Sequence, residues 1–416
     1  MNPPTIGPGG LDRLLAGIDA DRMTATVATL AGPAFTGRRA GSPGGLAART
    51  WLDRQMAVLG AQVTTAPFEV RAVPQIHAAP EATWHDGNGS HSLVFGRAVM
   101  PHPASADLPV VRRGGLAVAG SGDPVGRWLL VPAGMSLFDA YGHADGAAGL
   151  LVARGTDPDG WHYTVLAGSD PGPLPILTLD RAIHTTMTTA AGTGVGWLAA
   201  TAPIRRVDVT AANLHATWPQ TSAAGVQVLL TAHFDGVGDH PGLRQPAASD
   251  NATGVAVVLE AARILAPALP EGIGLAVALL DAEEVGALGS AHHAGQLRRA
   301  GATPLVINVD GAGHLGAAAA VEAGGPVHRL LALLDQAGRH TGLSLTAGPV
   351  ASDNRRYAAA GLAAVGIGAG MGGYHSPADT PERVDPATLA AVCRLVVATV
   401  WLTATSTSTL SSLIGD

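Results

Sequence analysis

The sequence predicts an α/β fold, in which a mostly parallel central sheet is flanked by helices and a small β-rich domain is inserted. From about residue 207, continuous apolar segments alternate with segments of helical periodicity. Such an alternation is typical of a parallel sheet whose two faces are covered by helices. Between residues 73 and 203, short apolar segments are separated by Gly, Pro and Asp turns, which favours a β-rich module. The length of 416 residues also favours two domains over a single core.

The first part of the chain is predicted to be mostly helical over residues 11–60, with an interruption near residues 33–45. Apolar residues from Leu46 to Leu59 recur at helical spacing, and Gly60 is a suitable C-terminal cap. Val63 to Val70 is then expected to be a strand. We assign residues 1–72 to the larger domain as its N-terminal part.

Residues 73–204 are predicted to form the inserted domain. The strands expected in it cover residues 116–119, 128–131, 149–152 and 176–179. The larger domain then resumes and occupies residues 205–416. Its strands are expected at 226–232, 273–281, 305–309 and 363–368, and its helices at 253–265, 291–300, 327–340 and 386–404, followed by a frayed tail.

Composition and charge exclude several classes of protein. The net charge is −7 and no basic block is present, so nucleic acid is not an expected partner. No segment reaches the roughly 18 apolar residues of a membrane span, and the apolar stretch from Leu389 to Ala404 contains Arg394, so we expect a buried helix there. The single cysteine, Cys393, is expected in the core. The N-terminus does not resemble a secretory leader, so a cytoplasmic protein is expected, or a secreted one if a leader was removed.

Polar side chains follow three of the predicted strands. His233 ends the string VQVLLTAH, Glu283 and Glu284 follow IGLAVALLDA, and Asp310 follows PLVINV. Because ligands bind beyond the carboxyl ends of strands in open parallel sheets, we expect these side chains to lie close together. Asp250 begins a helix in SDNATG, and His375 stands in a Gly-rich loop.

Two imidazoles and three carboxylates form a donor set that suits zinc, with Co²⁺ or Mn²⁺ as possible substitutes. A carboxylate can bridge two ions about 3.5–4 Å apart, and such a pair activates a water for hydrolysis. A further carboxylate must accept the proton of that water, and Glu283 is placed to do so. Asp235, two residues after His233, could accept the second ring N–H of that histidine.

Each of these residues also has a simpler explanation when it is taken alone. Asp250 could be an ordinary helix cap, Glu283 and Glu284 a solvated pair, and His233 a packed core residue. The joint pattern of five donors at strand ends and loops favours the two-metal site over these separate coincidences. The other histidines lack ligand spacing, and His240, His292 and His293 are expected at the surface.

The strings TAHFDGV, ASDNATGVAVVLEAARIL, LLDAEEVGALGS, INVDGAG and YHSPADTPERV resemble the bizinc aminopeptidase family, which includes leucyl aminopeptidases, glutamate carboxypeptidase and glutaminyl cyclase. The resemblance covers about residues 205 to 400 and the string TGRRAGSPGG near residue 36. It implies the phosphorylase/hydrolase-like zinc exopeptidase fold. It also implies that Asp250 bridges two zinc ions, one completed by His233 and Asp310 and the other by Glu284 and His375.

The same resemblance implies that Glu283 is the general base and that Tyr374 hydrogen-bonds the tetrahedral oxyanion. The strings GRWLLVPAG, FDAYGHADGAAGLLVARG and LPILTLD resemble a protease-associated domain, which in relatives helps to cover the cleft. One string departs from the family. Its members often carry Ser-Asp-His where this chain has Ser352, Asp353 and Asn354, followed by two arginines that are expected to be solvated.

The leading functional hypothesis is a zinc aminopeptidase that acts on peptides or aminoacyl compounds. A carboxypeptidase or an N-acyl amidohydrolase on the same two metals is the alternative enzyme. A non-catalytic binding module of this fold is a third reading, which the complete ligand set disfavours. A glutaminyl cyclase is less favoured, because cyclases use one zinc and this set suits two.

Overall fold

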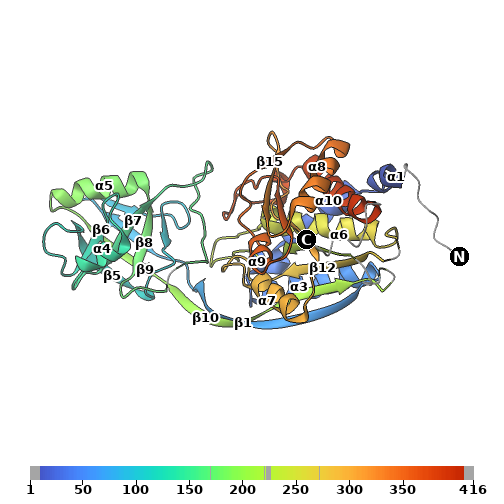
Figure 1. Cartoon of the computed structure of the whole chain (residues 1–416). Helices are drawn as coiled ribbons and strands as arrows, with labels where there is room; N and C mark the ends of the chain where they lie inside the picture. Colours follow the sequence, from blue (N-terminus) through green and yellow to red (C-terminus); the bar gives the residue numbers. More distant parts are fainter. Residues whose placement is uncertain (1–9, 169, 220, 222–225, 271, 407–416) are drawn as a thin grey trace.

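The computed structural model describes residues 10–406, except for residues 169, 220, 222–225 and 271. Two eight-stranded sheets lie in separate bodies, and two long strands reach from one body toward the other (Figure 1). These strands are β1 (Gln62–Ile76) and β10 (Ile204–Thr217), which pair in antiparallel register along nearly their full length. The chain therefore leaves the first body and returns to it along the same ribbon.

The first sheet has the strand order β1-β10-β12-β11-β13-β16-β14-β15. Its four central strands are parallel, while β1, β10 and β14 pair with antiparallel neighbours. The predicted α/β fold is thus confirmed. Of the antiparallel strands at its flanks, β1 contains the strand expected at Val63–Val70, whereas β10 and β14 were not predicted. The bounds are β11 Gln227–His233, β12 Gly274–Leu280, β13 Leu305–Val309, β14 Ala319–Gly324, β15 Leu345–Ala347 and β16 Ala364–Gly368.

Helices cover both faces of this sheet, which explains why its strands are apolar throughout. Along β11, Val228 and Leu230 belong to the large core beneath α6 and α10, whereas Leu229 packs in a second core with Tyr357 on the opposite face. The helices of this body are α1 Gly10–Ala16, α2 Ala20–Leu30, α3 Pro43–Val58, α6 Thr253–Leu265, α7 Leu288–Ala300, α8 His328–Thr341, α9 Asn354–Ala359 and α10 Pro386–Thr405, with short turns η1 Pro33–Arg38, η2 Ala248–Ala252 and η3 Pro381–Arg383.

The apolar C-terminal helix α10 is a core element. Among the described residues it is the one helix with the length and composition of a membrane span, and its mean hydropathy is 1.8. Within this body, however, 67% of its most apolar 18-residue segment is buried, and α10 packs against α6 and α8. Cys393 on this helix is fully buried, as expected. The end of the predicted tail, residues 407–416, lies outside the described residues.

The second sheet is built entirely from residues 82–202 and has the order β3-β2-β9-β5-β6-β7-β8-β4. The four strands expected here are present, but the sequence did not predict helices α4 (Leu137–Gly142) and α5 (Arg181–Gly192). The strand bounds are β2 Ala82–His85, β3 Ser90–Ser92, β4 Val99–Pro101, β5 Leu108–Val118, β6 Arg127–Leu130, β7 Gly149–Arg154, β8 Ile176–Asp180 and β9 Trp197–Ala202. Its core is separate from that of the first body.

Two histidines expected at the surface are buried instead. His293 is 7% exposed because its ring stacks on His215, at 4.0 Å between ring centroids, and its Nδ1 lies 2.9 Å from the hydroxyl of Tyr357. His240 is 9% exposed, and its Nε2 lies 3.1 Å from the hydroxyl of Thr164 in the second body. Both contacts join residues far apart in the sequence, so local patterns could not reveal them.

Candidate metal centre

The predicted ligands lie at one edge of the first sheet, because the parallel strands β11, β12 and β13 end there. His233 is the last residue of β11, Asp310 follows β13, and Glu284 comes four residues after β12. Asp250 stands in η2, immediately before the long helix α6. His375 is carried by the loop between β16 and η3.

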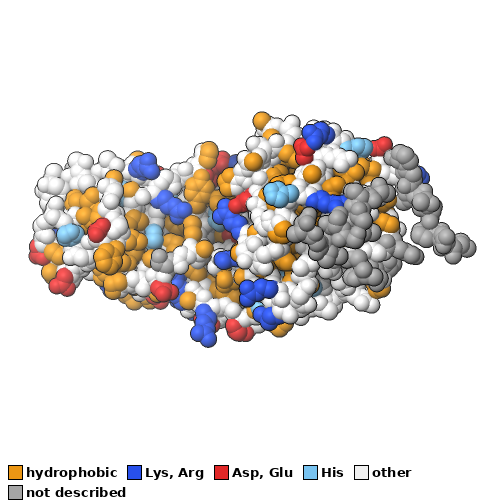
Figure 2. Space-filling view, in the orientation of Figure 1, with side chains coloured by type: hydrophobic (Ala, Val, Ile, Leu, Met, Phe, Trp, Pro, Cys, Tyr) orange, Lys and Arg blue, Asp and Glu red, His pale blue; other side chains and the backbone are white. Residues whose placement is uncertain are grey.

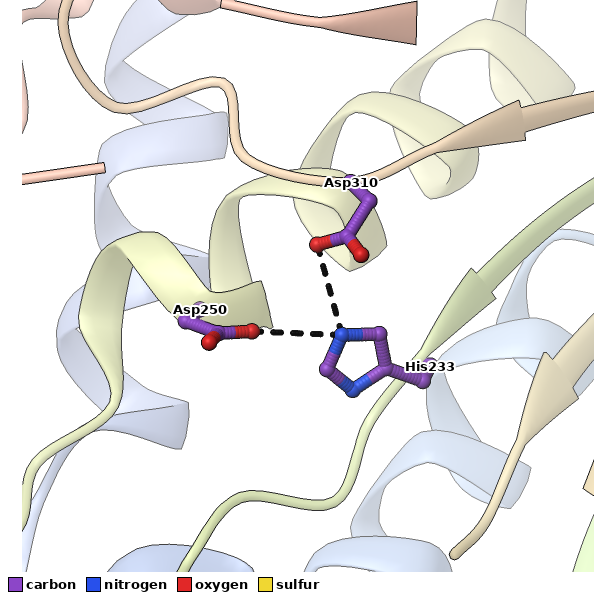
Figure 3. Close-up of side chains that lie close together, drawn as sticks. All are labelled: His233, Asp250 and Asp310. Atoms are coloured by element: carbon purple, nitrogen blue, oxygen red, sulfur yellow. Dashed lines mark hydrogen bonds and ion pairs between the residues drawn. The ribbon is translucent and has the colours of Figure 1, made fainter. Parts of the chain in front are cut away.

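His233, Asp250 and Asp310 point toward one another (Figure 3). The Nε2 atom of His233 lies 3.2 Å from Oδ1 of Asp250 and 3.3 Å from Oδ1 of Asp310. All three residues are buried. The imidazole and two carboxylates thus form one group of donors with the spacing of a metal site.

Glu284 and His375 form a second group with the same aspartate. The Nε2 atom of His375 lies 3.0 Å from Oδ2 of Asp250 and 2.8 Å from Oε2 of Glu284. One oxygen of Asp250 therefore faces each histidine. The two groups share this carboxylate, and within each group the ligand atoms lie within 4.8 Å of one another.

The electrostatics of this cluster favour the binding of divalent cations. Oε1 of Glu284 is buried with no hydrogen-bond partner, and burial raises the pKa of this carboxyl to about 7. Burial opposes protonation of His233, but the carboxylate of Asp310 and its neighbours raise the pKa of this histidine well above its ordinary value. Buried carboxylates that hold protons in this way form a site that bound cations stabilise, because the cations replace the protons.

Asp235 connects the first two ligand segments. Its backbone oxygen and Oδ1 lie 3.3 and 3.5 Å from Nδ1 of His233, on the ring edge opposite the other ligands. Its carboxylate also accepts hydrogen bonds from the backbone N–H groups of Glu283 and Glu284, at 3.0 and 3.2 Å. The predicted contact with His233 is therefore present. The residue additionally fixes the turn that carries the two glutamates.

Arg38 supports the site from behind, a role that the sequence analysis did not predict. Its side chain is fully buried and donates to the backbone carbonyls of Leu30, Phe234, Pro246 and Ala247, at 2.6 to 3.0 Å. Phe234 follows His233, and Ala247 precedes the η2 turn that bears Asp250. One guanidinium therefore fixes both backbone segments. The only sequence signal was its place in TGRRAGSPGG.

Asp379 and Asn251 hold Asp250 in position. The carboxylate of Asp379 accepts from the backbone N–H groups of Ser249 and Asp250, at 2.6 and 3.0 Å. The side chain of Asn251 donates to the carbonyl of Val309, at 2.9 Å, and so ties η2 to the end of β13. Burial raises the pKa of Asp379 to about 6. A carboxylate four residues after a predicted ligand was the signal that could have identified it.

Glu283 and Tyr374 lie on the wall of an open cleft, together with Glu284 and His375. The Tyr374 ring stacks on that of His375, with 3.7 Å between centroids, and its side chain is 43% exposed. Burial raises the pKa of the Glu283 carboxyl well above its ordinary value. Both residues are thus placed beside the ligands and open to a molecule in the cleft.

A segment of the second body, residues 155–168, also contacts the loop of His375, and we call it the strap. The buried carboxylate of Asp157 accepts from the hydroxyl of Ser376, at 2.7 Å. The backbone N–H of Thr164 donates to the carbonyl of His375, at 2.8 Å. Asp159 forms an ion pair with Arg383, at 2.6 Å. The second body therefore touches the metal loop directly.

Residues 213–400 match Peptidase family M28. This segment belongs to that family. The match includes all five predicted ligands of the metal centre, together with Glu283 and Tyr374, and it begins on β10 after the second body. A search of curated protein sequences found no match.

Solved structures resemble this chain over nearly its whole length. The aminopeptidase from Aneurinibacillus sp. strain AM-1 has 22% identity and a TM-score of 0.71, with 94% of this chain and 95% of that chain covered. The zinc aminopeptidase BSAP from Bacillus subtilis has 20% identity and a TM-score of 0.70, with 95% and 97% covered. The glutaminyl cyclase of Fimbriiglobus ruber has 16% identity and a TM-score of 0.52, with 92% and 95% covered. At these identities the likeness establishes the fold.

Proposed function

We propose that this M28 peptidase is a two-zinc aminopeptidase that removes N-terminal residues from peptides. The observation that carries the proposal is the carboxylate of Asp250, whose two oxygens face two separate donor groups. His233 and Asp310 would hold one ion, and Glu284 and His375 the other. When bound, two such ions lower the pKa of a water to about 7 and polarise the scissile carbonyl.

The residues of the chain supply the remaining chemistry. Glu283, on the cleft wall beside Glu284, accepts the proton of the attacking water and passes it to the leaving amine. Tyr374, exposed toward the same cleft, donates its hydroxyl hydrogen bond to the developing oxyanion. Asp235 keeps Nδ1 of His233 protonated, so that Nε2 is unprotonated and can bind a metal ion. The carboxylates around the ions attract the free amine of a peptide.

The central test is the Glu283→Gln variant, with Glu382→Gln at the exposed turn η3 as the matched control. Glu283→Gln is expected to bind both ions and to lose about a hundredfold or more in kcat on a leucyl anilide. Glu382→Gln is expected to keep full activity. Near-normal turnover by Glu283→Gln would contradict the general-base role of this residue.

Substrate blocking distinguishes the competing enzymes. An aminopeptidase cleaves the free-amine anilide and leaves its N-acetyl form intact. A carboxypeptidase cleaves neither anilide, because it requires a free C-terminal carboxylate, and it is detected instead with an N-acetyl dipeptide. An N-acyl amidohydrolase is detected by release of acetate from an N-acetyl amino acid. A substrate with N-terminal glutamine separates hydrolysis from cyclisation, because a cyclase releases ammonia and leaves the peptide bond uncut. A binding module of this fold would contain no stoichiometric zinc in metal analysis.

A further inference from the structure

A second groove, on the other body, adjoins the cleft beside the metal centre. Arg154, Val165 and Ala167 line both hollows, so the two meet at the end of β7 and at the strap. The second groove is open to solvent and reaches helix α4, far along the chain from the metal ligands. The two adjoining hollows therefore extend from Glu284 and His375 to α4.

The far part of the groove is mostly apolar. Its lining includes Leu137, Phe138 and Tyr141 of α4, together with Pro103, Ala104 and one acidic residue, Asp170. Phe138 is 85% exposed, although its neighbour on the same helix, Ala140, is fully buried. An exposed phenylalanine is ordinary by itself, but one that lines a groove leading to a reactive centre is typical of a binding site. Figure 2 shows hydrophobic side chains gathered over this body.

The junction between the two hollows offers hydrogen-bond donors. Arg154 lies between them, and its Nη1 donates to the carbonyl of Tyr163 at a long 3.4 Å. Among the described residues no carboxylate pairs with it, so its other N–H groups can donate to carbonyl oxygens. His102, also in the groove, adds no charge at neutral pH, because burial lowers its pKa to about 4. An apolar wall with one donor-rich side chain fits an extended peptide backbone.

We propose that this groove binds the part of a peptide substrate that follows the cleaved bond, with an apolar side chain packed against Phe138. The inference rests on the proposed aminopeptidase function, because in that reaction the leaving peptide extends away from the metal centre. The shared lining points to this occupant, since a peptide held at Glu284 and His375 that extends past Val165 and Ala167 meets the groove. The preferred substrates are then oligopeptides with an apolar residue downstream.

The experiment compares Phe138→Ala with Val125→Ala, which removes another exposed apolar side chain of the same body outside the groove. The substrates share N-terminal leucine and are an anilide and peptides of two to six residues, with phenylalanine or glycine at each downstream position. Wild type is expected to prefer the longer peptides that carry phenylalanine. Phe138→Ala should lose about tenfold in kcat/KM on those peptides alone, through KM. Val125→Ala should lose nothing on any substrate.

Three results would overturn the inference, and they are distinguishable. If wild type is active but Phe138→Ala keeps the full preference for long apolar peptides, the groove does not bind substrate. If Phe138→Ala instead changes only the sedimentation of the protein, the occupant is a second copy of the chain. If zinc-loaded wild type cleaves no free-amine substrate of any length, the proposed function fails and the groove assignment fails with it.

Discussion

Asp157 of the second body accepts a 2.7 Å hydrogen bond from Ser376, the residue that follows the ligand His375. Asp157 is 5% exposed and Ser376 is 1% exposed. The other carboxylate oxygen of Asp157 accepts from the backbone of Asp159 and Trp161, at 2.9 and 2.8 Å, and thereby shapes the strap. A carboxylate on one body thus orders its own loop and the metal loop of the other body.

We predict that Asp157→Ala lowers the affinity for the ion held by Glu284 and His375 by about 10- to 100-fold, because supporting contacts of this kind orient the ligands. Isothermal titration of metal-free protein with zinc measures this, and the ion at His233 and Asp310 should be affected little. Asp157→Asn keeps an oxygen that can face Ser376 and should recover part of the affinity. Asp145→Ala, exposed on the same body, is the control, and equal losses in both alanine variants would contradict the prediction.

Replacement of Asp250 by alanine should abolish binding of both ions, because Asp250 alone belongs to both donor groups. Replacement of His233 by alanine removes a donor from one group only. The zinc content of purified protein should therefore fall to near zero for Asp250→Ala and to about one ion for His233→Ala. Equal zinc content in the two variants would argue against the bridging position.

Arg38→Met is expected to lower the free energy of unfolding by on the order of 3 kcal/mol or more, since four buried carbonyls lose their donor. The effect appears as a lower denaturant midpoint in metal-free protein. Arg299→Ala, at the exposed end of α7, should stay within about 0.5 kcal/mol of wild type. A midpoint for Arg38→Met as high as that of the control would show that water replaces the guanidinium at no cost.

The buried pair His215 and His293 should make stability depend on pH. Burial lowers the pKa of His293 from 6.5 to about 3 and that of His215 to about 4. Below pH 6.5 the unfolded chain therefore binds protons that the folded chain does not. The contribution of the two histidines to the free energy of unfolding is therefore complete above pH 6.5 and is lost on acidification. For each histidine the loss is about 1.4 kcal/mol per pH unit, between the pKa of the unfolded chain and that of the folded chain.

The measurement is the free energy of unfolding of chelator-treated protein between pH 7.5 and pH 5, for wild type and for His293→Asn. Because the metal is removed beforehand, ions released on unfolding do not contribute to the measured free energies. The variant is expected to lose less stability on acidification than wild type. Parallel curves for the two proteins would show that His293 is protonated in the folded state.

The sequence predicted the elements whose pattern is local. Helix α6 and strand β13 begin and end where the apolar periodicity indicated, and β11 ends at the histidine expected as a ligand. The five ligand positions could be proposed because each stands at the end of a strand or in a loop with a recognisable string. Helices α4 and α5 were missed because α4 has only six residues and both stand among the short apolar strands and turns that predicted a β-rich module.

What the sequence determined by itself was the donor chemistry, namely two imidazoles and three carboxylates at the end of a parallel sheet. The tertiary structure alone decided which atoms of Asp250 face which histidine, and that Arg38, Asp379 and Asp157 support the ligands. The physical reason is the range of these contacts. Asp157 and Ser376 are 219 positions apart, and Arg38 and Ala247 are 209 apart, so no local pattern encodes their pairing. Packing between the two bodies brings Asp157 to Ser376, and packing within the first body brings Arg38 to Ala247.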